Sequence, residues 1–334
     1  MSGGSVPYHL RQNKAVERGV FVDLLFRVGR ATPDALQRYQ YIGLAGPFSE
    51  DFKLLHSQIG IKSFVSIEEK EAVHLRQLWN SPLRGIDYRR CKTQEFIDAF
   101  VRVKPTVVWL DYASPSEVGA QLAEVEQLVA KLQDYDVLKV TFCASDHSLE
   151  RGQGRESPEA KIEQARQRLG DYLPAGTHLS AEDVDWKGYP KLVMKCAEIA
   201  VKSGMRGSAS SRFQLLTTFS YSDSAHRMLT FTGIVLPRGK VTEFFGKSRI
   251  SGWDLATTRW GGNGTVPKQI QIPELSLRER LFVDQQLPKR GSPKTIMRRL
   301  GFRITDGGDA KTVDALASYR DFYRYFPYFS KMVV

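Results

Sequence analysis

The sequence contains few cysteines and no cluster of metal-binding side chains. Its three cysteines, Cys91, Cys143 and Cys196, lie far apart in apolar or strand-like surroundings. An odd number of distant cysteines is typical of reduced packing residues, so we predict no disulfide. The six histidines follow no ligand spacing such as H-E-x-x-H. We therefore predict no structural metal.

Long apolar runs are also missing. No segment approaches the roughly 18 uncharged apolar residues that a membrane span requires. The first residues, MSGGSVPYHLRQNK, lack the apolar centre of a signal peptide. We expect a soluble, cytoplasmic protein without a membrane partner.

Acidic residues are fewer than basic ones. Lysine and arginine number 48 against 37 aspartates and glutamates, which gives a net charge of +11. An excess of this size favours nucleic acid as a partner, because neutralising phosphates releases condensed counterions. Charge that serves only solubility stays open as the alternative.

The pattern of apolar residues predicts an α/β protein with a Rossmann-like, mostly parallel sheet. An amphipathic helix is expected over 13–27, and strand and helix signals then alternate, as in βαβ units. Two later β-rich runs, 213–221 and 227–236, form a late antiparallel hairpin. The five parallel strands are predicted at 41–45, 62–67, 85–90, 106–111 and 137–142.

Four regions follow from this pattern. An N-terminal arm and helix occupy 1–37, and the Rossmann-like domain spans 38–240 with a charge-rich insertion at 145–211. A Gly-rich linking segment covers 241–272, and 273–334 forms a small C-terminal helical domain with helices near 276–286, 292–300 and 313–322. Basic residues flank its second helix, as a nucleic-acid contact or a solvated face: Lys289, Arg290, Lys294, Arg298 and Arg299.

Ligands of open parallel sheets bind at the carboxyl ends of the strands. Gly43 and Gly46 follow the first strand, and Glu68 follows the second. This spacing suits a backbone turn close to a cofactor and a carboxylate on its ribose. Gly46-Pro47 is also a common way to end a strand, and Glu68 could simply be a charge at a helix start.

Asp111 and Tyr112 close the most apolar strand. A charged residue in that place must either reach solvent or be paired, so Asp111 is the candidate catalytic group. Tyr112 could stack on a planar substrate or on adenine, or it could cap the sheet edge.

The segments YIGLAGPF, VSIEEKE and VVWLDYASP, with the late hairpin, resemble class I S-adenosylmethionine-dependent methyltransferases. More narrowly, they are similar to O-methyltransferase-like and three-Cys-motif-partner-like proteins of bacterial antiphage defence loci. The similarity covers roughly residues 38 to 236.

The resemblance implies S-adenosylmethionine as the cofactor and a role in antiphage defence, with a partner protein or nucleic acid. It places the methionine part of the cofactor against the first strand's turn and the acceptor beside Asp111 and Tyr112. The cofactor residues that it implies, together with the neighbouring strand-end positions, are Gly43, Ala45, Gly46, Glu68, Glu69 and Cys91.

The sequence departs from the family pattern in two places. Tyr41 and the Pro47-Phe48 pair stand in the region where the first motif carries an acidic residue and a third glycine. The Asn/Asp-Pro-Pro-aromatic motif of amino-group methyltransferases is replaced by Leu-Asp-Tyr-Ala. The second departure disfavours base N-methylation and leaves O-methylation and loss of catalysis open.

Three functions therefore compete. The first is a methyltransferase, and the second is a catalytically degenerate binding or sensor subunit of a defence complex. The third is a metal-dependent nuclease that would use Glu68, Asp111 and Asp51 as ligands. A cleft filled by Phe48 or Trp79 would favour the binding subunit over the enzyme.

Overall fold

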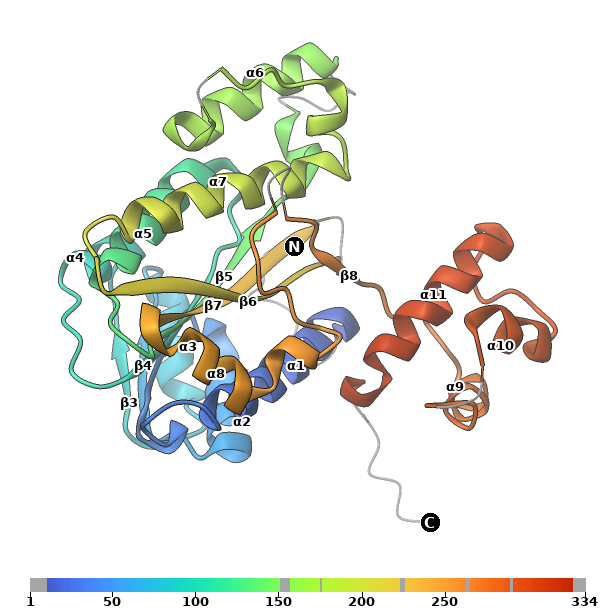
Figure 1. Ribbon diagram of the computed structural model, residues 1–334, viewed down its shortest axis with the longest axis horizontal. Helices are drawn as coiled ribbons and strands as arrows, with labels where there is room; N and C mark the ends of the chain where they lie inside the picture. The colour runs from blue at the N-terminus through green and yellow to red at the C-terminus, as the bar shows by residue number, and fades with distance from the viewer. Residues whose placement is uncertain are drawn as a thin grey trace.

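The computed structural model describes residues 11–150, 157–174, 176–222, 226–261, 265–288 and 291–326. Its centre is an eight-stranded sheet in the order β3-β2-β1-β4-β5-β7-β6-β8 (Figure 1). The first five strands are parallel, and β7 pairs antiparallel with both β5 and β6. The predicted Rossmann-like sheet with a late antiparallel hairpin is thus confirmed. The strands are β1 Gln40–Gly43, β2 Ser63–Ile67, β3 Ile86–Arg89, β4 Thr106–Asp111, β5 Val137–Cys143, β6 Ser211–Tyr221, β7 Met228–Pro237 and β8 Lys268–Ile270.

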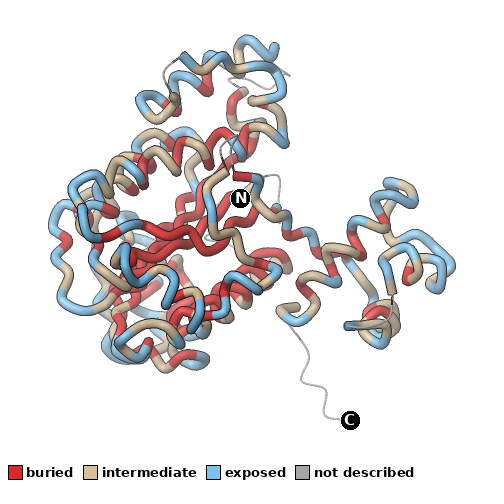
Figure 2. The backbone as a smooth tube through the Cα atoms, viewed as in Figure 1, coloured by how far each residue is buried: buried red, intermediate tan, exposed pale blue. Residues whose placement is uncertain are grey.

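Helices cover both faces of the sheet. Alternate residues of β4 show this division, because Val107 and Trp109 pack with α1 and α2, whereas Val108 and Leu110 pack with α5 and α7. On the first face lie α1 Gln12–Gly29, α2 Glu50–Ile59, α3 Glu71–Trp79 and α8 Val241–Ser248. On the second lie α4 Thr93–Asp98, α5 Val118–Lys131 and α7 Gly188–Gly204. The buried residues concentrate in and around the sheet between these layers (Figure 2).

The predicted insertion at 145–211 is too wide. α7 lies beside α5 and buries Val193, Cys196 and Ala197 completely, so it belongs to the helical layer of the core (Figure 1). Its apolar face was obscured by the polar segment that precedes it. Only the part before α7 stands apart, and we call residues 157–174 and 176–187, with α6 Pro158–Leu169, the α6 lobe.

The segment 241–272 differs from the irregular linker that was expected. α8 covers the first face of the sheet through Phe244, and β8 extends the sheet by pairing parallel with β6. A strand of three residues in Gly-rich surroundings gives too short a pattern to be recognised from sequence.

Three helices follow, as predicted: α9 Leu277–Asp284, α10 Pro293–Leu300 and α11 Gly308–Phe322. Their apolar core is continuous with the main fold, because Leu316 and Phe322 cluster with Val16 of α1 and Phe219 of β6. Among the described residues, no helix combines the length and apolarity needed to cross a bilayer. The arm 1–10 and the basic residues Lys289 and Arg290 lie outside the described residues.

This shared core predicts that the C-terminal helices unfold together with the sheet. Leu316→Ala, at a fully buried site, should lower the free energy of unfolding by about 2–5 kcal/mol. Leu281→Ala is the matched control, since Leu281 is 55% exposed and should cost far less. Urea denaturation followed by circular dichroism and tryptophan fluorescence should give one coincident transition. Two separate transitions would show an independent C-terminal domain.

Candidate functional site

The carboxyl ends of β1, β2 and β4 bring the predicted cofactor residues to one edge of the sheet. Gly43 is in register with Ser66 of β2 on one side and Trp109 of β4 on the other. Gly46 and Glu68 lie in the segments that follow β1 and β2, and Asp111 is the last residue of β4, so all three lie at the same edge of the sheet. The geometry therefore agrees with a ligand site at this edge, and each residue's role in it stays a prediction.

A tight turn follows β1. Gly46 has φ 56° and begins the 3-10 turn Gly46–Phe48, and Ser49 then adopts a left-handed conformation before α2. A side chain at position 46 would be strained, so glycine is required there. Gly43 has a different reason, because a Cβ at this position would stand 2.8 Å from the hydroxyl of Tyr41. Tyr41, which replaces the family's acidic residue, is thus packed over Gly43.

Glu68 lies half-buried where β2 ends. Its Oε1 accepts a hydrogen bond of 2.8 Å from the backbone N–H of Lys70, and Oε2 has no partner among the described residues. Burial raises the pKa of Glu68. The carboxylate therefore keeps one oxygen available to a hydroxyl donor, as a ribose would require.

The other two strand-end candidates differ in exposure. Glu69 is exposed, and Cys91 is partly buried. Burial raises the pKa of the Cys91 thiol, so it is not an activated nucleophile. All three cysteines are free thiols, as the sequence predicted.

Asp111 is paired with a residue of the N-terminal helix. Lys14 Nζ lies 2.8 Å from Asp111 Oδ2, and the two side chains are only 8% and 10% exposed. Burial works against the charged carboxylate, but the charge and hydrogen bond of Lys14 outweigh it and lower the pKa of Asp111. A carboxylate with a lowered pKa is a weak general base at neutral pH.

Two further ion pairs extend this contact into a cluster. Glu17 of α1 pairs with Lys139 of β5, and Arg18 of α1 pairs with Asp51 of α2, all four side chains being buried. Together with Lys14 and Asp111 they form three cations and three anions, and we call these six residues the α1 ion cluster. The spacing of its three α1 members, i, i+3 and i+4, places them on one face of the helix. Sequence reasoning missed the cluster, although Lys139 in an apolar strand was a visible signal.

Tyr112 turns to the opposite face of the sheet. Its ring stacks on Phe142 at 5.9 Å, and its hydroxyl donates a hydrogen bond of 2.5 Å to Glu124 of α5. Tyr112 is buried in the core, so stacking on a ligand would require its displacement.

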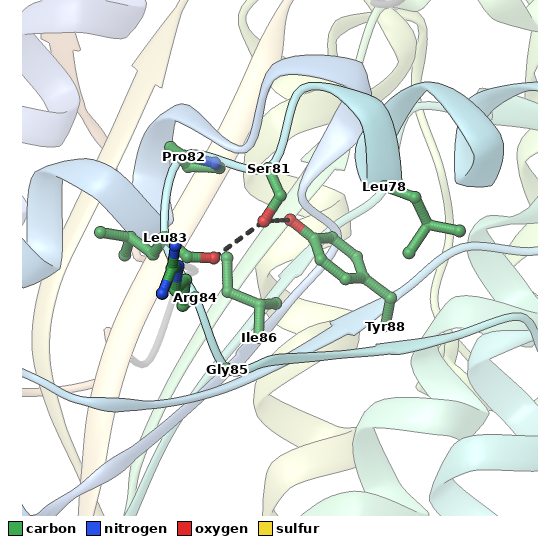
Figure 3. Close-up of a pocket in the computed structure, with 8 residues that line it drawn as sticks. All are labelled: Leu78, Ser81, Pro82, Leu83, Arg84, Gly85, Ile86 and Tyr88. Atoms are coloured by element: carbon green, nitrogen blue, oxygen red, sulfur yellow. Dashed lines mark hydrogen bonds between the residues drawn. The ribbon is translucent and has the colours of Figure 1, made fainter.

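Of the two bulky side chains that could fill the cofactor cleft, Trp79 extends into solvent, whereas Phe48 lies in the turn that follows β1. Trp79 is 90% exposed, and Phe48 packs under the guanidinium of Arg76. A pocket of about 400 Å³ lies elsewhere, beside edge strand β3, where Tyr88 donates to Ser81 (Figure 3). It contains none of the predicted site residues.

The structure argues against the metal-dependent nuclease, because two of its three proposed metal ligands already form ion pairs. Asp51 is paired with Arg18 and Asp111 with Lys14, so cations already neutralise two of the three proposed carboxylates. Within the described ranges, no group of three or more His, Cys, Asp or Glu side chains could hold a metal ion.

Comparison with known proteins gives one family match. The family described as "Putative O-methyltransferase" matches residues 6–334. A search of curated proteins finds no match.

Several solved structures are similar at low identity. The N-methyltransferase NodS from Bradyrhizobium japonicum is 10% identical, with a TM-score of 0.37 over 66% of this chain and 97% of its own. The O-methyltransferase TomG from Streptomyces achromogenes, in complex with S-adenosylmethionine, is 11% identical, with a TM-score of 0.35 over 65% and 79%. Similarity at this level does not identify a methyl acceptor.

Lys14→Met tests how much the buried Lys14–Asp111 pair contributes to stability. The substitution leaves a buried carboxylate unpaired and should cost about 3–5 kcal/mol of unfolding free energy at pH 7. The double variant Lys14→Met/Asp111→Leu should recover most of that loss. Because the pKa of Asp111 is lowered from its ordinary 3.8, the contribution of the pair should persist above about pH 4 and disappear as the pH falls through the lowered pKa. Urea titrations across this range measure it, and a cost below about 1 kcal/mol for Lys14→Met would contradict the buried pairing.

Proposed function

The chain belongs to the O-methyltransferase family that its residues 6–334 match, and we propose from this premise that it binds S-adenosylmethionine and methylates an oxygen acceptor. The cofactor would lie across the carboxyl ends of β1, β2 and β4. Its sulfonium supplies an already activated methyl group when bound. The protein's task is then to hold cofactor and acceptor in line.

The observation that carries this proposal is the meeting of the β1 turn and Glu68 at one sheet edge. Gly46 has no Cβ, so its turn would allow a cofactor to approach the backbone closely, and α2 begins directly after it with its N–H groups toward the same edge. Oε2 of Glu68 would accept a hydrogen bond from a ribose hydroxyl. Ala45 and Cys91 would line the methionine and adenine ends of the cofactor.

Asp111 would act as a positioning group. It stays ionised at neutral pH and bound to Lys14, so the neutral pair would be a fixed polar group beside the acceptor. Methyl transfer would then depend mainly on proximity and alignment: the acceptor oxygen would form a bond to the methyl carbon as the bond to sulfur breaks, S-adenosylhomocysteine would leave, and the hydroxyl proton would pass to solvent.

Nucleic acid is the acceptor class that we propose, because the net charge of +11 favours a polyanion. A second function, that of a binding or sensor subunit, is supported by the commitment of Asp111 to Lys14. Participation in an antiphage defence complex, with a partner protein, stays a prediction.

Glu68→Gln tests the cofactor site. Losing a charged acceptor for a ribose hydroxyl should weaken S-adenosylmethionine binding by about 10-fold or more, since such bonds contribute about 1.5–3 kcal/mol. Isothermal titration with S-adenosylmethionine and S-adenosylhomocysteine measures the affinity. Glu274→Gln, at an exposed glutamate outside the predicted site, is the control and should bind as the wild type does. Absence of binding to the wild type would sink the cofactor assignment.

Transfer itself is followed with a labelled methyl group and RNA or DNA as acceptor. Incorporation into RNA but not into its 2′-deoxy counterpart would identify a ribose hydroxyl. Cofactor binding without any transfer would support the sensor function.

A further inference from the structure

Trp186 is an exposed aromatic ring with two cations on it. The residue lies at the end of the α6 lobe, just before α7, and is 49% exposed. The guanidinium of Arg227 lies 4.7 Å from the ring centroid, and Lys187 Nζ lies 5.5 Å from it. An aromatic face with adjacent cations is the combination that binds nucleobases and phosphates.

This group lies at the same edge of the sheet as the cofactor site. The carbonyl of Arg227 accepts a hydrogen bond of 2.8 Å from the backbone N–H of Ala144, which directly follows β5. β5 is the neighbour of β4, where Asp111 is in register with Thr141. Trp186 therefore lies beside the start of β7, which is separated from β4 by β5 alone.

The ring is held in place by its neighbours. Asp185 accepts hydrogen bonds of 2.7 Å from the backbone N–H groups of Lys187 and Gly188, which fixes the start of α7. A side chain at Gly188 would collide with the carbonyl of Glu182. Arg227 donates to the carbonyl of Trp186 itself. A rigid ring loses little conformational entropy on binding.

Arg227 has no carboxylate partner within 4 Å among the described residues, although it is half-buried. Its guanidinium donates to the carbonyl of Trp186 and, at 3.2 Å, to Ser220 Oγ, and its other three N–H groups have no hydrogen-bond partner among the described residues. Burial lowers the pKa of Arg227, and Asp146 and Asp185 oppose this only from a longer distance. A partly desolvated cation without a counterion is suited to an anion from outside.

We propose that Trp186, Arg227 and Lys187, here called the Trp186 platform, bind single-stranded nucleic acid, with one base stacked on the indole and its phosphate on Arg227. The inference rests on the proposed function and specifies how its acceptor is held. A single strand is required because a base paired within a duplex does not expose its face to an aromatic ring. The net charge of +11 favours a polymer over a free nucleotide, because several phosphates then contribute.

The test is fluorescence anisotropy with labelled 12-nucleotide single-stranded RNA and DNA and with a duplex of the same length. Trp186→Ala should weaken binding to the single strands about 5- to 100-fold, the effect of losing one stacked base. Arg227→Met should weaken binding and reduce the slope of log K against log salt by about 0.7, as expected for one phosphate. Trp186→Phe keeps an aromatic face and should retain most of the affinity.

Trp79→Ala is the matched control, because Trp79 is more exposed and no cation lies over its ring among the described residues. It should bind as the wild type does. Four outcomes would each overturn the platform. The two tryptophan variants could lose affinity equally, or the wild type could prefer the duplex. AMP at the concentration of the strand could compete fully, or the wild type could fail to bind. Titration of Trp186→Ala with S-adenosylmethionine separates the two proposals, since cofactor binding should be unchanged even if the platform is wrong.

Discussion

The structure depends on the α1 ion cluster, which holds the N-terminal helix on the sheet. Burying a charge in a protein interior costs several kcal/mol unless it is paired. Each of the three charges on one face of α1 has an opposite charge on β4, β5 or α2, so the cluster is neutral. Two of the cations lie over the ring of Trp109, with Lys139 Nζ 3.8 Å and Arg18 Cζ 5.4 Å from its centroid. The helix is therefore fixed over the strand ends that form the proposed site.

This constraint limits the chemistry available at the end of β4. A carboxylate that is ionised and bonded to Lys14 cannot readily take a proton, so Asp111 differs from a general base of raised pKa. A reaction whose methyl donor is already activated depends less on proton transfer than on geometry. The same pairing is also compatible with a protein that binds the cofactor without transferring its methyl group. The ion pair is therefore consistent with both functions, methyl transfer and cofactor binding without transfer.

Sequence patterns predicted the fold because apolar periodicity is local. β4 begins and ends as expected at Thr106–Asp111, since its apolar run is continuous and both its faces are covered. The α1 ion cluster could not be predicted, because its partners lie 33, 97 and 122 residues apart along the chain. The strand-end positions of Gly46 and Glu68 followed from the sheet alone. The packing of Tyr41 over Gly43 did not, because it depends on side-chain direction.

The α6 lobe is joined to the core at the start of α7. The chain leaves the sheet after β5, forms the lobe, and returns at Gly188 into α7, which is buried against α5 (Figure 1). Trp186 stands at this return, so the hydrogen bonds of Asp185 that begin a core helix also orient the exposed ring. The end of the lobe contacts the start of β7, and the C-terminal helices pack against the end of β6. An acceptor would therefore be bound by elements added to the sheet, whereas the cofactor would be bound by the sheet itself.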